Sequence, residues 1–194
     1  MGRWEPGADD RLREAAMRLY VERGFEQTTV AEIAQSAGVT ARTFFRYFTD
    51  KREVLFAGSA EFQRRMVRAV ETAPGATSPM RAVQTALDVA AELLGDDHAH
   101  ARSRWGVIVA NQELRERELI KMASLTAALA GALRGRGVPE PDASLAAEAG
   151  IAVFRVGFER WVAGPAEIGL AQTLAESFER LATVTATRAL ENGP

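Results

Sequence analysis

The sequence contains no cysteine, no long apolar run and almost no net charge. Without cysteine there is no disulfide framework, no thiolate zinc site and no cysteine nucleophile. No apolar stretch approaches the roughly 18 residues of a membrane-spanning helix, and the first residues lack the apolar core of a secretory signal peptide. We therefore expect a cytoplasmic protein with no membrane partner.

The charge balance also excludes a protein that is basic overall. The chain has 24 Lys and Arg residues against 26 Asp and Glu residues, a formal net charge of −2. Hydrophobic residues make up 47% of its 194 residues, which is typical of a folded globular protein with a real core. Any surface that binds nucleic acid must therefore be a local patch.

Apolar residues recur at helical spacing along nearly the whole chain, and no strand-like alternation interrupts them. In the first such stretch, Leu12, Ala15 and Leu19 lie on one helix face. The pattern predicts an all-α fold of about nine helices. Their expected ranges are about 10–23, 29–37, 40–48, 50–73, 79–95, 98–110, 112–134, 142–163 and 168–190.

Capping residues mark two of the expected helix starts. Thr29 and Glu32 have the spacing of a capping box, in which side chain and backbone bond reciprocally at the helix N-terminus. Asp50 and Glu53 offer a second capping pair. We therefore expect a long fourth helix that runs from Asp50 to just before Pro74.

Residues 29–48 combine two short amphipathic helices with a glycine turn at Gly38. This is the spacing of a helix-turn-helix, whose second helix lies in the DNA major groove. Between Gly38 and Arg52 there are four basic residues and one acidic residue, whereas the first 60 residues hold nine of each. From this pattern alone, DNA binding and a purely structural turn between two helices stay equal alternatives.

Four segments resemble, in order and spacing over about residues 9–58, the N-terminal signature of TetR-family transcriptional regulators. They are Glu22-Arg-Gly-Phe25, Thr28-Thr-Val-Ala-Glu-Ile-Ala34, Ala37-Gly-Val-Thr40 and Thr43-Phe-Phe-Arg-Tyr-Phe-Thr-Asp-Lys51. Residues 113–119 resemble actinobacterial members, some of which sense acyl-CoA-like ligands. The resemblance implies a helix-turn-helix DNA-binding domain in residues 1–55 and a helical ligand-binding and dimerisation domain in residues 56–194.

The resemblance also assigns DNA contacts. Thr29 would donate hydrogen bonds to a phosphate from a helix N-terminus, and Arg42 could hold a guanine in a bidentate contact. Phe45 stands where the family usually has tyrosine, which puts one phosphate hydrogen bond in doubt. The expected DNA-binding residues are Thr29, Thr40, Ala41, Arg42, Thr43, Phe45, Arg46, Tyr47 and Lys51.

For the remaining helices, the resemblance implies that the fifth to seventh helices enclose a ligand cavity and that the last two form a four-helix interface with a second subunit. Candidate pocket residues are Trp105, Val109, Met122, Phe154 and Phe158, although an aromatic stripe at helical spacing is more often ordinary core. Small residues recur along one face of the 142–163 helix, which indicates close backbone approach, either to a second subunit or to the last helix of the same subunit. The expected interface residues are Ala146, Gly150, Val153, Gly157, Leu174, Phe178 and Leu181.

No motif for catalysis, cofactor binding or metal binding stands out. The sequence lacks G-x-S-x-G, a P-loop, G-x-G-x-x-G and H-E-x-x-H. His98 and His100 would point about 200° apart on a helix, with no evident third ligand. We therefore expect that the protein is not an enzyme and binds no cofactor or metal. We expect instead a repressor that a small, largely apolar effector releases from operator DNA. The alternatives are a transcriptional activator and a helical ligand-binding or enzymatic protein that does not bind DNA.

Overall fold

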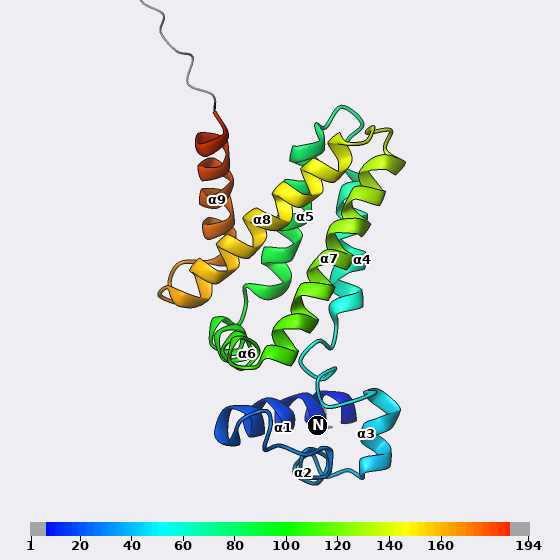
Figure 1. Ribbon diagram of the computed structural model, residues 1–194, viewed down its shortest axis with the longest axis vertical. Helices are drawn as coiled ribbons and strands as arrows, with labels where there is room; N and C mark the ends of the chain where they lie inside the picture. Colours follow the sequence, from blue (N-terminus) through cyan, green and yellow to red (C-terminus); the bar gives the residue numbers. More distant parts are fainter. Residues whose placement is uncertain (1–6, 187–194) are drawn as a thin grey trace, which may run out of the picture. The chain divides into compact units, whose positions relative to one another are not determined.

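The computed structural model describes residues 7–186, and in that range it contains nine helices and no strand (Figure 1). The all-α prediction is confirmed, although the part of the last helix expected beyond residue 186 lies outside the described residues. None of the nine helices is long and apolar enough to cross a membrane. The helices are α1 (Ala8–Arg23), α2 (Val30–Ser36), α3 (Ala41–Tyr47), α4 (Ser59–Thr72), α5 (Pro79–Leu94), α6 (His98–Ala110), α7 (Gln112–Gly135), α8 (Asp142–Ala163) and α9 (Leu170–Thr185).

The fourth helix does not begin at Asp50, which corrects the prediction from the capping pair. Residues 51–58 instead form consecutive turns, in which amides bond to the carbonyl three residues earlier. The Asp50 carboxylate caps these turns by accepting from the amides of Arg52 at 2.8 Å and Glu53 at 3.2 Å. Gly58 then adopts a φ of +85°, which favours glycine and separates the turns from α4.

The chain forms two compact units, each assembled from separate segments. Unit 1 contains the described residues up to Glu61 together with Ala99–Lys121, and therefore α1, α2, α3, most of α6 and the start of α7. Unit 2 contains Phe62–His98 and the described residues from Met122 onwards. Helix α7 thus contributes to both units. The expected domain boundary after residue 55 stays a prediction.

Unit 1 has a core in which α1 packs on α2 and α3. Leu12, Ile33 and Phe44 come one from each helix and are fully buried. Ile108 of α6 and Leu114 of α7 join the same apolar cluster. The helix-turn-helix is therefore packed on elements that lie more than 50 residues further along the chain.

Unit 2 is organised around α8, which packs on both α5 and α9. Leu87 of α5, Trp161 of α8 and Leu170 of α9 are each no more than 1% exposed. Burying such side chains contributes roughly 1.5–3 kcal/mol each, so this three-helix contact stabilises the unit.

Candidate nucleic-acid interface

The turn between α2 and α3 is closed by two backbone hydrogen bonds around Gly38. The N–H of Val39 donates to the carbonyl of Ala34 at 2.9 Å, and the N–H of Gly38 donates to Gln35 at 3.1 Å. This is a Schellman motif, and it requires the left-handed conformation that Gly38 adopts with a φ of +69°. The turn therefore determines the direction in which α3 leaves α2.

Helix α3 is capped at its start and anchored by two aromatic side chains. The hydroxyl of Thr40 accepts from the amide of Thr43 at 3.1 Å, which satisfies one of the free N–H groups at the helix N-terminus. Phe44 and Phe48 lie four residues apart and are buried, with ring centroids 5.5 Å from each other. Because this face is fixed inward, the opposite face of α3 points to solvent.

The exposed face of α3 carries two arginines and two aromatic rings. Arg42, Phe45 and Arg46 are all exposed, and Phe45 retains 58% of its accessible surface. The Arg46 guanidinium donates to the Tyr47 hydroxyl at 2.9 Å and lies 4.8 Å from the ring centroid of Tyr47. Among the DNA-binding residues expected on α3 and its cap, Thr43 is half-buried and the others are exposed. The exposed ones are Thr40, Ala41, Arg42, Phe45, Arg46 and Tyr47.

Thr29 lies at the N-terminus of α2, as expected, but its donors are occupied. Its amide and its hydroxyl both donate to the Glu32 carboxylate at 2.8 Å, and the Glu32 amide donates back to the hydroxyl. The hydrogen bond from the Thr29 amide, followed by that from its hydroxyl, lowers the pKa of Glu32. A phosphate at this helix end would have to compete with an ionised carboxylate.

Lys51 has a structural role that the assignment as a phosphate contact did not foresee. Its ammonium donates to the carbonyls of Phe25 at 2.7 Å, Thr28 at 3.0 Å and Glu26 at 3.3 Å. The backbone carbonyl of Lys51 accepts in turn from the hydroxyl of Tyr20 at 2.6 Å, and burial raises the pKa of Tyr20. The three donors of the ammonium therefore hold the loop between α1 and α2.

Lys51→Met should lower the free energy of unfolding by about 1–3 kcal/mol, because three carbonyls lose a charged donor while the aliphatic stem keeps its length. Urea denaturation measures this change. Arg46→Met is the matched control on the exposed face of α3 and should leave the unfolding midpoint unchanged. If Lys51→Met leaves the midpoint unchanged and instead flattens the salt dependence of DNA binding, Lys51 is a phosphate contact after all.

The five candidate pocket residues are divided between the two units. Phe154 and Phe158 lie in unit 2, where both are buried and their rings stack with centroids 5.9 Å apart. Met122 is half-buried at the start of the unit 2 part of α7. Trp105 packs against the core of unit 1, and Val109, also in unit 1, is 41% exposed. Phe154 and Phe158 are therefore part of the core of unit 2, which was the alternative to a ligand pocket.

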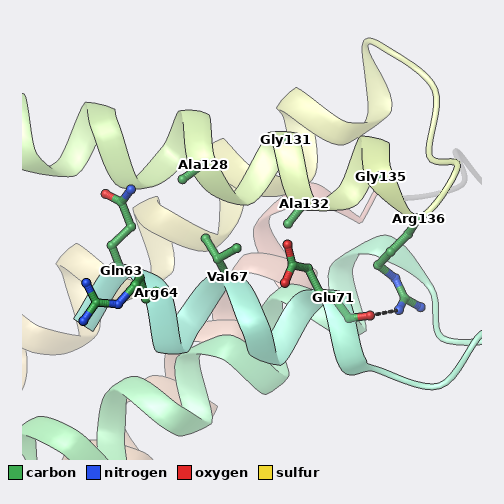
Figure 2. A pocket seen from close by; sticks show the side chains of 9 residues that line it. All are labelled: Gln63, Arg64, Val67, Glu71, Ala128, Gly131, Ala132, Gly135 and Arg136. Carbon is green, nitrogen blue, oxygen red and sulfur yellow. Dashed lines mark hydrogen bonds between the residues drawn. The ribbon is translucent and has the colours of Figure 1, made fainter. Parts of the chain in front are cut away.

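A groove of about 500 Å³ lies between α4 and α7 within unit 2 (Figure 2). Figure 2 shows Val67 in the middle of the groove, Arg64 at one end, and Glu71 and Arg136 at the other. The Arg136 guanidinium donates to the backbone carbonyl of Glu71 at 3.3 Å. On the α7 side, a side chain at Gly135 would meet nothing within 4 Å. None of the five candidate pocket residues lines this groove.

The small residues of α8 make the close approach that their spacing indicates, but they make it within the chain. A Cβ atom at Gly150 would collide with Val83 of α5, and one at Gly157 would lie 2.6 Å from the Cδ2 atom of Leu174 in α9. Two further predicted interface residues, Ala146 and Val153, are buried on the same face. This face, together with Leu174, is therefore enclosed by the subunit itself, which corrects its assignment to the dimer interface.

Two of the predicted interface residues are still accessible for contact with a second subunit. Phe178 and Leu181 lie on α9 and are half-buried. The rest of the outward surface of α8 and α9 consists of residues that the sequence analysis did not select, among them Leu145 and Val156, which are 65% and 51% exposed. The helical spacing of Leu145 and Val156 could have predicted this surface. The interface was instead predicted from the small residues on the opposite face of α8.

The two histidines are not brought into a metal-binding group. A ring nitrogen of His98 lies 3.0 Å from the backbone carbonyl of Trp161, and the two rings meet edge to face. Across residues 7–186, no group of three or more His, Cys, Asp or Glu side chains is placed to hold a metal ion.

Charged residues from α6 and α7 reach the turns after α3, and the sequence pattern does not predict these contacts. Arg104 donates from Nε to the carbonyl of Leu55 at 2.7 Å, and Arg117 pairs with Glu53. These partners are 49 and 64 residues apart. At such separations no local spacing signals a contact.

Two family models match this chain. The model described as bacterial regulatory proteins, tetR family, matches residues 12–57, and the model of the MftR C-terminal domain matches residues 77–186. The first match covers the helix-turn-helix, and the second covers more than half of the chain.

Curated relatives and a solved structure agree with these matches. The chain is 35% identical over 77 residues to the regulator TcmR of Streptomyces glaucescens, covering 40% of this chain and 34% of TcmR. It is 30% identical over 147 residues to the regulator EthR of Mycolicibacterium smegmatis, covering 71% of this chain and 66% of EthR. These matches thus span between a third and two thirds of the relatives' length. The Thermus thermophilus repressor FadR, solved in complex with lauroyl-CoA, superposes with a TM-score of 0.58 at 25% identity, over 96% of this chain and 99% of FadR.

Proposed function

Because the chain belongs to the tetR family of bacterial regulatory proteins, we propose that it is a homodimeric transcriptional repressor that a small, largely apolar effector releases from operator DNA. The observation that carries the proposal is the outward face of α3, where Arg42, Phe45 and Arg46 are exposed beside a capped helix start. A duplex major groove accommodates a helix of this kind, and guanidinium groups suit its acceptors.

Within this proposal, Arg42 reads a base and its neighbours bind the backbone. Arg42 lies in the first turn of α3 and points away from the buried Phe44, so its guanidinium can reach guanine O6 and N7. Arg46 and Tyr47 form one hydrogen-bonded pair at the other end of α3, which suits a phosphate. Thr29 would join them once a phosphate displaces Glu32.

The homodimer in this proposal uses the outward surface of α8 and α9. On α8 the residues Leu145, Ala149, Ala152 and Val156 follow one another at spacings of four, three and four, and they lie opposite the face that packs on α5 and α9. On α9, Ala175 and the half-buried Phe178 and Leu181 extend the apolar surface. Such exposed stripes on two packed helices are typical of a four-helix interface.

Two observations support the effector part of the proposal. FadR, which the chain resembles along nearly its whole length, was solved with lauroyl-CoA. In unit 2 the groove between α4 and α7 offers an open space with an apolar middle, and Phe154 and Phe158 provide an apolar lining if the core opens. An effector with a long apolar part matches both features.

Selection of DNA from a random pool by the purified protein tests the proposal and yields the operator. A repressor predicts a palindromic site whose half-sites match the spacing of two reading helices. Transcription of a reporter behind that site should fall when the protein is added, whereas an activator would raise it. A helical ligand-binding or enzymatic protein would select no sequence and would lack a salt-dependent affinity for DNA.

Arg42→Ala should weaken binding to the selected operator by about 1–3 kcal/mol and relax specificity at one base pair in each half-site, because a bidentate base contact is lost. Fluorescence anisotropy with single-base operator variants measures both effects. Arg13→Ala is the matched control, since Arg13 is an exposed α1 arginine whose partners are Asp9 and Asp10. Equal weakening on every sequence would instead make Arg42 a phosphate contact.

A further inference from the structure

The residues that follow α3 are held by charged side chains from the start of α7. We call residues 50–57, which lie between α3 and α4, the post-α3 segment. The Glu53 carboxylate accepts from Nε of Arg117 at 2.5 Å and lies 3.8 Å from the ammonium of Lys121. Arg117 and Lys121 are four residues apart, so they project from one face of α7 and place Glu53 between them.

Two further contacts fasten the same segment. The Arg52 guanidinium donates to Asp50 at 2.8 Å within the segment and to Glu113 of α7 at 2.9 Å. Arg104 of α6 donates to the carbonyl of Leu55 at 2.7 Å and to Glu118 of α7 at 3.4 Å. All of these contacts lie within unit 1. The post-α3 segment is therefore tied to α6 and α7 by several charged side chains rather than by apolar packing alone.

Among the charged residues of the post-α3 segment, Glu53 has two cationic partners on α7. It faces two cations, and the side chains of Glu53, Arg117 and Lys121 are only 23%, 36% and 31% exposed. Solvent and salt screen such partly buried pairs less than fully exposed ones. Glu53 also lies six residues after the end of α3, among turns anchored by the buried Leu55 and Phe56. Only five residues, anchored by the buried Phe48, separate Glu53 from the end of α3.

We propose that Glu53, held between Arg117 and Lys121, is a positioning residue that couples the reading helix α3 to α7. Helix α7 continues from unit 1 into unit 2, where it lines the groove with α4. A rotation of α7 about its axis, or a shift along it, would move the two cations and, with them, Glu53 and the post-α3 segment. Glu53 therefore sets the orientation of α3 without touching DNA. This inference rests on the proposed function, since it assumes that α3 binds an operator.

A double-mutant cycle tests the coupling in the full-length protein. Glu53→Gln and Arg117→Gln should each weaken binding to the selected operator by roughly fivefold, and the double variant should be no weaker than either single variant. Arg117→Lys keeps the charge and should bind close to the wild type. Asp9→Asn is the control, because it removes an exposed ion pair with Arg13 inside α1. Urea denaturation identifies any variant whose loss of binding is a loss of folding.

Hydrogen exchange supplies a readout that a merely structural role would not change. In the wild type, operator DNA should slow exchange in α3 and also in residues 112–121. In Glu53→Gln, saturating DNA should still protect α3 but no longer residues 112–121. Protection of 112–121 that survives in this variant, or additive losses in the cycle, overturns the role of Glu53. A wild type that selects no operator overturns the proposed function, and this inference with it.

Discussion

Gly157→Leu should destabilise the subunit by about 3 kcal/mol or more, with a fall in Tm of roughly 6–12 °C. A Cβ atom at this position would already lie 2.6 Å from Leu174 Cδ2, and 3.3 Å from both the Cα atom of Leu174 and the carbonyl oxygen of Thr173. The Leu174 methyl group can rotate away, but the two backbone atoms cannot. The branched side chain must therefore separate α8 from α9, and thermal and urea unfolding measure the result.

Gly106→Leu is the matched control for this prediction. Gly106 lies within α6, and a Cβ atom there would meet nothing within 4 Å. Since glycine costs about 1 kcal/mol relative to alanine inside a helix, the replacement should leave stability unchanged or raise it slightly. Gly157→Ala should fall between the two leucine variants. If Gly157→Leu unfolds like the wild type but no longer dimerises, this glycine faces a second subunit, as the sequence first suggested.

The glycines of α8 illustrate what spacing can and cannot establish. Two glycines on one helix stripe indicate a close neighbour. The structure places the backbone of α9 close to Gly157, whereas the neighbour of Gly150 is the side chain of Val83 in α5. Spacing does not identify the partner, because α5, α9 and a second subunit would all select the same small residues. Only the three-dimensional arrangement shows that the approach takes place inside the chain.

The helix-turn-helix was predictable because its determinants are local. The capping box at Thr29, the left-handed Gly38 and the cap at Thr40 each act over four or five residues, so each appears directly in the sequence. The capping pair at Asp50 is a local signal too, but it starts a series of turns that ends at Gly58, and α4 begins only at Ser59.

The role of Lys51 could not be predicted in the same way. In the sequence it is one of several cations near α3, and an exposed cation there suits a phosphate. Its three acceptors belong to the loop between α1 and α2, some 25 residues earlier in the chain. The same holds for Glu53 and Arg117, whose contact depends on how α7 packs in unit 1.

A substitution on the outward surface of α8 and α9 should have a large effect on dimerisation rather than on folding. In the single subunit, Val156 is 51% exposed, and it continues the stripe that begins at Leu145. In a two-fold symmetric dimer each residue of the interface is used twice. Removing one apolar side chain from such a surface and adding a charge therefore acts at two places in every dimer.

Val156→Glu should raise the Kd of dimerisation roughly 100-fold or more, because each carboxylate would lose water without gaining a partner. Operator affinity should fall by a similar or larger factor, since one subunit can hold only one half-site at a time. The subunit itself should unfold as the wild type does, because Val156 is largely solvated there. Sedimentation equilibrium measures the association. Val21→Glu places the same charge at a valine of α1 that is 59% exposed, and this control should stay dimeric. A Val156→Glu protein that remains dimeric at the same concentration would place the interface on another surface.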